Sequence, residues 1–222
     1  MIELDNVTKI YTIGEIKVTA LDNISFRCEK GEMISIMGPS GSGKSTMMNI
    51  LGCLDSPTSG SYFLDGQDVS SLNDNQLAMT RNKKLGFVFQ SYNLLPKLTA
   101  IANVELPLLY AGVKHRRQRA LEALESVGIS ERARHRPSEM SGGEQQRVAI
   151  ARALINNPLI ILADEPTGNL DTHSSQGIMT LLLEQCKKGI TIIVVTHEED
   201  IAKYTQRTIY LRDGKIVEEK KR

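Results

Sequence analysis

Residues 38–45 read GPSGSGKS, a glycine-rich run that ends in a lysine and a hydroxyl side chain. Glycines let backbone N–H groups turn inward around phosphate oxygens, and the positive end of a following helix favours the same anions. We expect Lys44 to reach the β- and γ-phosphates of a nucleotide and Ser45 to offer its hydroxyl to Mg²⁺. The predicted phosphate loop comprises Gly38, Pro39, Ser40, Gly41, Ser42, Gly43, Lys44, Ser45 and Thr46.

An apolar run that ends in two carboxylates is the second candidate for chemistry. Residues 159–165 read LIILADE, which is typical of a buried strand with Asp164 and Glu165 at its carboxyl end. Ligands in open α/β sheets bind at that edge. We expect Asp164 to hold Mg²⁺ through water, and Glu165 to act as general base for an attacking water. A single Asp after an apolar run is weak evidence for a functional site. The pair Asp164 and Glu165 is stronger evidence because the same chain contains a phosphate loop.

Two further polar residues follow apolar runs in the same way. Gln90 ends LGFVFQ, where an amide can orient a water molecule or contact Mg²⁺. His197 follows ITIIVVT, where a histidine can donate a hydrogen bond to the γ-phosphate. Either residue alone would be interpreted as a structural side chain. Both gain weight because each is predicted to lie at a strand end, as Asp164 is.

A second glycine-rich segment, SGGEQ at residues 141–145, contains no lysine. Ser141 suits a helix N-cap, and Glu144 completes a capping box three residues later. Gly142 and Gly143 leave backbone N–H groups uncovered at the positive end of that helix, so the segment can bind an anion. An ordinary capped helix is the alternative. The segment lacks a cation and a metal ligand, so it suits a site that completes another site.

The elements that position these residues follow from hydrophobic patterning. The first 30 residues alternate apolar and polar side chains, which indicates strands. Later, short apolar runs alternate with helix-like stretches, which predicts a parallel sheet covered on both faces. A mostly helical insertion is expected over 94–157, and RDG at 212–214 indicates a closing hairpin.

Composition excludes several classes of protein. The 222 residues carry 27 Lys and Arg against 26 Asp and Glu, a balance that does not favour nucleic-acid binding. Three widely spaced cysteines, Cys28, Cys53 and Cys186, are expected to be reduced and buried or half-buried, and no metal site is expected from them. No apolar run approaches the roughly 20 residues of a membrane span. The N-terminal residues MIELDNVTKIY do not show the basic-then-apolar pattern of a signal peptide.

Taken in order, GPSGSGKST, Gln90, SGGEQ, ILADEPT, NLD and the histidine in VVTHE resemble the ATP-binding subunit of ABC transporters. The likeness covers essentially the whole chain, and no catalytic position departs from the pattern. Position 144 is Glu, where relatives often have Gln, a difference expected to be neutral. The strings GCLDSPTSG, GFVFQSYNLLP and NVELPLLYAG resemble the MacB and LolD group, which serves macrolide or peptide export and lipoprotein release.

The resemblance implies an α/β fold, a RecA-like P-loop NTPase core with an N-terminal antiparallel β lobe. The core would comprise 1–93 and 158–222, with 94–157 as an inserted helical subdomain. Two subunits would close around two ATP molecules and Mg²⁺, and Ser141, Gly142, Gly143 and Glu144 would act on the partner's nucleotide. Tyr11 would stack on adenine, although a core tyrosine is the alternative, and Asp171 would shape the subunit interface.

The resemblance also implies a separate integral-membrane permease. Gln90 would link the nucleotide to it, and SYNLLPKLTAIANVELPLL, after Gln90, would receive its coupling helix. The subunit would then be cytoplasmic and peripheral on the inner face of the membrane. Two alternatives stay open. One is a cell-division-type (FtsE-like) regulatory ATPase, which sequence separates poorly. The other, a soluble ABC ATPase without a transport role, is disfavoured because the chain lacks long heptads and contains each motif once.

Overall fold

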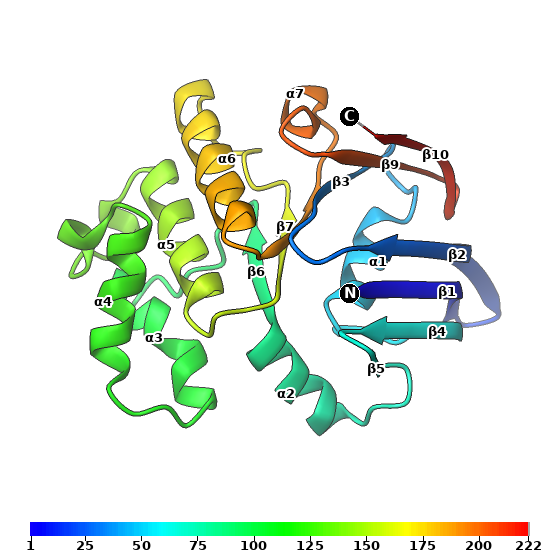
Figure 1. Cartoon of the computed structure of the whole chain (residues 1–222), viewed down its shortest axis with the longest axis horizontal. Helices are drawn as coiled ribbons and strands as arrows, with labels where there is room; N and C mark the ends of the chain where they lie inside the picture. Colours follow the sequence, from blue (N-terminus) through cyan, green and yellow to red (C-terminus); the bar gives the residue numbers. More distant parts are fainter. Residues whose placement is uncertain (222) are drawn as a thin grey trace. The chain divides into compact units, whose positions relative to one another are not determined.

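The computed structural model describes residues 1–221, which fold as two compact units (Figure 1). Unit 1 comprises Met1–Arg81 and the chain from Ile193 onward, and unit 2 comprises Asn82–Ile192. The chain passes between the units within α2 (Asp74–Lys84) and again within β8 (Thr191–Val195). No helix among residues 1–221 has the length and hydrophobicity required to span a membrane.

Unit 1 contains an antiparallel sheet of order β2-β1-β4-β5, as expected for the N-terminal β lobe. A long hairpin dominates it, with Ile2 opposite Cys28 at the open end and Ile13 opposite Ile16 at the turn (Figure 1). The apolar side chains of one face are buried, whereas the hairpin tip is exposed. The strands are β1 (Ile2–Ile13), β2 (Ile16–Cys28), β4 (Ser59–Leu64) and β5 (Gln67–Asp68).

Unit 1 also contains three strands in the order β10-β9-β3. All five residues of β3 (Met33–Met37) are buried, as expected for a parallel strand covered on both faces. It pairs in parallel with β9 (Arg207–Arg212), which turns through Asp213 and Gly214 into antiparallel β10 (Lys215–Lys221). The predicted closing hairpin is therefore confirmed. The helices of unit 1 are α1 (Lys44–Leu51) and α7 (Glu199–Ala202).

Unit 2 contains a parallel pair, β6 (Leu85–Phe89) and β7 (Ile160–Asp164). Leu85 pairs with Ile160 and Phe89 with Asp164, so the two strands end side by side. Sequence patterning placed Gln90 in the first of these strands, but β6 ends at Phe89, and Gln90 begins the following turn. This correction leaves Gln90 beside the carboxyl end of β7.

The helices of unit 2 include three that pack against one another, α3, α4 and α5 (Figure 1). They join through fully buried apolar side chains such as Val104, Leu124 and Ile150. The interval 94–157, predicted to be mostly helical, contains all three together with two short 3₁₀ turns. The bounds are α3 (Ala100–Tyr110), α4 (Arg116–Ser126), η1 (Ser130–Arg132), η2 (Pro137–Glu139), α5 (Gly142–Leu154) and α6 (Thr172–Lys187).

Candidate functional site

The phosphate loop of unit 1 follows β3 and leads into α1, as the sequence predicts. Gly38 and Gly43 have φ angles of +154° and +101°. A Cβ on Gly38 would lie 2.2 Å from the carbonyl oxygen of Leu211, and one on Gly43 would lie 2.5 Å from that of Ala20. Both positions therefore require glycine, because a side chain would be strained and would meet fixed backbone.

Backbone hydrogen bonds fix the loop to the rest of unit 1. Gly214, in the turn between β9 and β10, donates its N–H to the carbonyl of Ser42 at 3.1 Å. Thr196 donates its N–H to the carbonyl of Ile36, near the end of β3. The exposed His197 follows directly, so the structure brings this predicted residue to the strand end from which the loop begins.

The loop presents donors and no acid. The N-cap of α1 is Gly43, with no side-chain cap, and the first turn contains no acidic residue, so its N–H groups are open to an anion. Lys44 Nζ donates to the carbonyls of Gly38 and Pro39 at 2.7 and 2.8 Å, which draws the ammonium over the loop. The Ser42 hydroxyl is buried and has no hydrogen-bond partner in the described part of the chain. These features fit a phosphate group.

Tyr11 is fixed at its hydroxyl and half-buried at its ring. The hydroxyl donates to Asp55 Oδ2 at 2.8 Å, and Lys9 Nζ donates to Asp55 Oδ1 while lying 4.9 Å from the Tyr11 ring centroid. Burial and the bond to Asp55 raise the pKa of Tyr11, which the Thr46 hydroxyl opposes. Burial opposes ionisation of Asp55, but hydrogen bonds from Lys9 and Tyr11 outweigh it and lower the Asp55 pKa. Tyr11 therefore lies beside the first turn of α1.

Unit 2 collects the predicted residues that follow β6 and β7. Gln90 Nε2 donates to Asn169 Oδ1 at 3.4 Å, and Asn169 Nδ2 donates to the Gln90 carbonyl at 3.0 Å. Asp164 ends β7, and Glu165 follows with a φ of +46°, in the left-handed region that side chains rarely adopt. Gln90, Asp164 and Glu165 thus lie at one strand edge.

The loop after β7 is tied to the helix that carries SGGEQ. Gln146 Nε2, in α5, donates to the carbonyl of Pro166 at 2.6 Å, and both side chain and bond are buried. Asp171 ends the loop as the N-cap of α6, where its carboxylate accepts from the N–H of Ser174 at 3.0 Å. Hydrogen bonds from Ser174 lower the Asp171 pKa. A buried hydrogen bond therefore joins the residue after Glu165 to α5.

The predicted capping box at α5 is confirmed. The Ser141 hydroxyl oxygen accepts from the N–H of Glu144 at 3.2 Å, and Glu144 Oε2 accepts from the N–H of Ser141 at 2.7 Å. Arg132 Nε donates to Glu144 Oε1 at 2.9 Å. The backbone bond from Ser141, with help from Arg132, lowers the Glu144 pKa. The Ser141 hydroxyl hydrogen is not used in this cap, so Ser141 keeps a donor.

The predicted site residues fall into two sets. Unit 1 brings Tyr11, the phosphate loop and His197 together, and unit 2 holds Gln90, Asp164, Glu165 and the residues of SGGEQ. Sequence reasoning missed their supports, which are Lys9, Asp55, Arg132, Gln146 and Asn169. Asn169 belongs to the NLD motif, but no role was predicted for its side chain. The other four carry no local signal, because each acts on a partner at least twelve residues away or on a backbone atom.

Comparison with known proteins assigns the family. The family model described as "ABC transporter" matches residues 21–168. The ABC transporter ATP-binding protein YvrO of Bacillus subtilis is 54% identical over 98% of this chain and 96% of its own. The macrolide export ATP-binding/permease protein MacB of Chlorobaculum tepidum is 54% identical over the whole chain, which spans 34% of MacB.

A solved structure agrees along the full length. The dimeric, post-hydrolysis structure of the ATP-binding cassette MJ0796 with ADP and Pi, from Methanocaldococcus jannaschii, superposes with a TM-score of 0.92. It is 50% identical and covers 100% of this chain and 98% of its own. The phosphate loop, the carboxylates after β7 and SGGEQ all lie within the matched family region. This chain therefore belongs to the ABC transporter family.

Proposed function

We propose that the chain binds and hydrolyses ATP as a subunit that drives a separate membrane permease. One observation carries the proposal. The loop backbone, which requires glycine at positions 38 and 43, forms a cradle for phosphate together with Lys44 and the uncapped N-terminus of α1. The family match and the solved cassette with ADP and Pi support ATP as the nucleotide. Likeness to proteins named for macrolide export supports export of a drug as the task, and the sequence resemblance adds a peptide or lipoprotein as alternative cargo.

Hydrolysis divides among residues of both units in this proposal. Lys44 and the loop N–H groups bind the β- and γ-phosphates, and Tyr11 stacks on adenine. Ser45, Asp164 and Gln90 supply oxygen ligands of the kind Mg²⁺ prefers, and Mg²⁺ would neutralise charge on the phosphates. Glu165 accepts the proton of the attacking water, and His197 donates a hydrogen bond to the γ-phosphate.

SGGEQ would serve the nucleotide of a second copy of the chain. The Ser141 hydroxyl retains its hydrogen, and Gly142 and Gly143 open α5 with uncovered N–H groups, so the segment offers donors to a γ-phosphate. Glu144 holds Ser141 in place through the capping box. The dimeric structures of MJ0796 support a two-fold arrangement, in which each copy completes the other's site.

The permease would bind the segment that follows Gln90. Within this segment, Leu95 and Leu109 expose 48% and 53% of their surface, and a partner can cover such apolar side chains. Gln90 is bonded to Asn169, so a shift of this segment would reach the loop after β7. Binding to a permease would hold the subunit at the inner face of the cell membrane.

Substitution of Lys44 tests the nucleotide proposal. We expect Lys44→Ala to weaken binding of a fluorescent ATP analogue about 10- to 100-fold, because it removes a charged donor from the phosphates. Exposed Lys30→Ala is the matched control and should bind as the parent protein does. Equal affinity for Lys44→Ala and Lys30→Ala would contradict the assignment of the loop.

Capture from membranes tests the partner. Glu165→Gln protein, charged with ATP and Mg²⁺, should recover an integral-membrane permease from native membranes, identified by mass spectrometry. Lys44→Ala protein is the negative bait, because it should not reach the nucleotide-bound state. Recovery of only soluble or ribosomal proteins would overturn the transport assignment and leave the ATPase proposal intact.

A further inference from the structure

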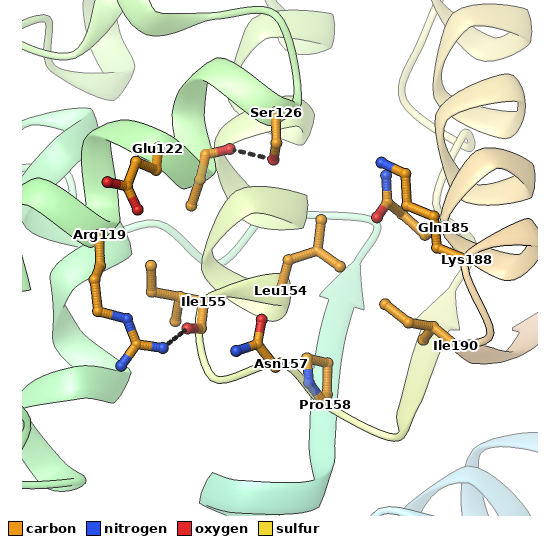
Figure 2. A pocket seen from close by; sticks show the side chains of 11 residues that line it. Arg119, Glu122, Ser126, Leu154, Ile155, Asn157, Pro158, Gln185, Lys188 and Ile190 are labelled. Carbon is orange, nitrogen blue, oxygen red and sulfur yellow. Dashed lines mark hydrogen bonds between the residues drawn. The ribbon is translucent and has the colours of Figure 1, made fainter.

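Unit 2 contains a pocket of about 500 Å³ that involves none of the predicted nucleotide residues (Figure 2). It lies among the C-terminal parts of α4, α5 and α6. The size is within the range of about 300–1,000 Å³ that is common for small-molecule sites. The lining residues that matter are Arg119, Glu122, Leu154, Pro158, Gln185 and Lys188.

Gln185 is the unusual member of this lining. Its side chain is directed from α6 toward the pocket, and only 5% of the residue is exposed (Figure 2). The amide nitrogen Nε2 is buried and has no hydrogen-bond partner among residues 1–221. A buried donor without an acceptor destabilises the fold by about 1–3 kcal/mol, so its retention calls for a partner from outside. Rotation about the last side-chain bond is soft and can turn Nε2 toward a ligand.

Three backbone carbonyls beside the pocket already accept hydrogen bonds. The Ile155 carbonyl accepts from an Arg119 terminal nitrogen at 2.9 Å, and the Leu154 carbonyl accepts from the Asn157 N–H at 2.8 Å. The Gln185 carbonyl accepts from the Lys188 N–H at 3.1 Å. The helix C-termini therefore offer few free acceptors to a ligand, although their partial negative charge would otherwise attract cations.

What the pocket offers instead is donors and apolar walls. The Arg119 guanidinium has five N–H groups, one of which donates to the Ile155 carbonyl, and Lys188 carries an exposed ammonium. Glu122 is the only acidic side chain in the lining, and its Oε1 accepts from Gln118 Nε2 at 3.0 Å. Two cationic side chains against one anionic one favour a ligand with negative charge. Leu154, Pro158 and Ile190 supply apolar contact.

We propose that this pocket binds a small organic carboxylate with an apolar body. The carboxylate accepts from the Gln185 amide and lies between Arg119 and Lys188, while the body packs against Leu154, Pro158 and Ile190. The pocket and its lining belong to unit 2 alone, so the site is independent of the phosphate loop in unit 1.

Three probes of equal length test the proposal on nucleotide-free protein: octanoate, octylammonium and 1-octanol. Octanoate should give saturable heat in calorimetric titration and shift the side-chain NH₂ signal of Gln185 in ¹⁵N NMR spectra. Gln185→Leu and Lys188→Gln should each weaken octanoate about tenfold, because each removes one hydrogen bond to a charged group. Lys187→Gln changes the neighbouring exposed lysine outside the lining and should bind octanoate normally.

Controls separate binding from damage to the fold. Gln185→Leu removes a donor that has no partner, so its thermal midpoint should not fall below that of the parent protein. Lys44→Ala should bind octanoate normally, which distinguishes this proposal from the nucleotide assignment. Equal binding of octylammonium or octanol, no binding of octanoate, or unchanged affinity in Gln185→Leu and Lys188→Gln would each overturn it.

Discussion

Glu165 has a left-handed backbone, φ +46°, at the position directly after β7. A glutamate gains nothing locally from this conformation, which costs of order 1 kcal/mol, so the surrounding structure must hold it there. Its carbonyl accepts from the N–H of Gly168, which closes a tight turn. In our proposal this turn holds Glu165 in place as the general base.

Replacement of this carboxylate tests its role. We expect Glu165→Gln to bind ATP normally, to hydrolyse it at least about 100-fold more slowly, and to form a stable dimer with ATP and Mg²⁺. The amide keeps the size of the side chain but cannot accept the proton from water. Phosphate release measures hydrolysis, and sedimentation measures the dimer. Exposed Glu184→Gln should behave as the parent, and a Glu165→Gln variant with full turnover would exclude Glu165 as the base.

For single residues, the sequence predicted the chemical groups but not the side chains that hold them in place. GPSGSGKS and LIILADE combine residue types that phosphate chemistry needs, and these segments form the predicted loop and strand. The bond from Tyr11 to Asp55 spans 44 residues of chain and could not be predicted, because no local pattern encodes which carboxylate a tyrosine will meet.

Among the elements, α5 depends most clearly on ionised groups. Its capping box uses the carboxylate of Glu144, which Arg132 also contacts, and the Glu144 side chain is 26% exposed. The helix N-terminus favours negative charge at this position. Since the folded pKa of Glu144 is lowered, its stabilisation is present above the ordinary value of 4.5 and is lost as pH falls through the folded pKa.

Glu144→Gln isolates the charge, because glutamine preserves the capping acceptor. At pH 7 the variant should melt about 1–4 °C below the parent protein, as expected for loss of a charge at a helix N-terminus. The difference should shrink as the pH is lowered below 4.5. Thermal melts from pH 7 to pH 3 provide the measurement. A constant difference over that range would mean that the charge of Glu144 does not stabilise α5.

The elements with strong patterns were predicted, and a weakly patterned one was not. α5 and β7 were expected from capping and from continuous apolar character, and both are present. α2 was missed because it buries only Leu77 and Thr80, too few positions to give a helical stripe. The boundaries 94 and 157 of the helical subdomain stay a prediction.

For the whole molecule, the division of site residues between two units is the main feature. Tyr11 and the phosphate loop belong to unit 1, whereas Glu165 and Ser141 belong to unit 2. In our proposal one ATP engages Lys44 of its own chain and Ser141 of a second copy, so the dimer closes only when nucleotide is bound. Affinity for nucleotide and the ability to hydrolyse it are then separable by mutation.

The Ser141→Arg substitution should separate nucleotide binding from hydrolysis. An arginine at the N-cap cannot accept the Glu144 N–H and places bulk where the second copy's nucleotide would approach, so we expect hydrolysis to be lost. Nucleotide binding to the monomer should change less than about twofold, because the phosphate loop is intact. Exposed Ser130→Arg is the control and should retain activity. Loss of monomer binding in Ser141→Arg would place Ser141 in the site of its own chain.

The hydrogen bond from Gly214 to Ser42 sets the order in which a growing chain can acquire function. β3, which leads into the phosphate loop, pairs with β9, almost 170 residues later in the chain. A ribosome must therefore synthesise the chain as far as β9 and Gly214 before the loop is fixed, and closure of so long a segment is slow. Products truncated before β9 lack this anchor, so we expect them to leave the phosphate loop unfixed.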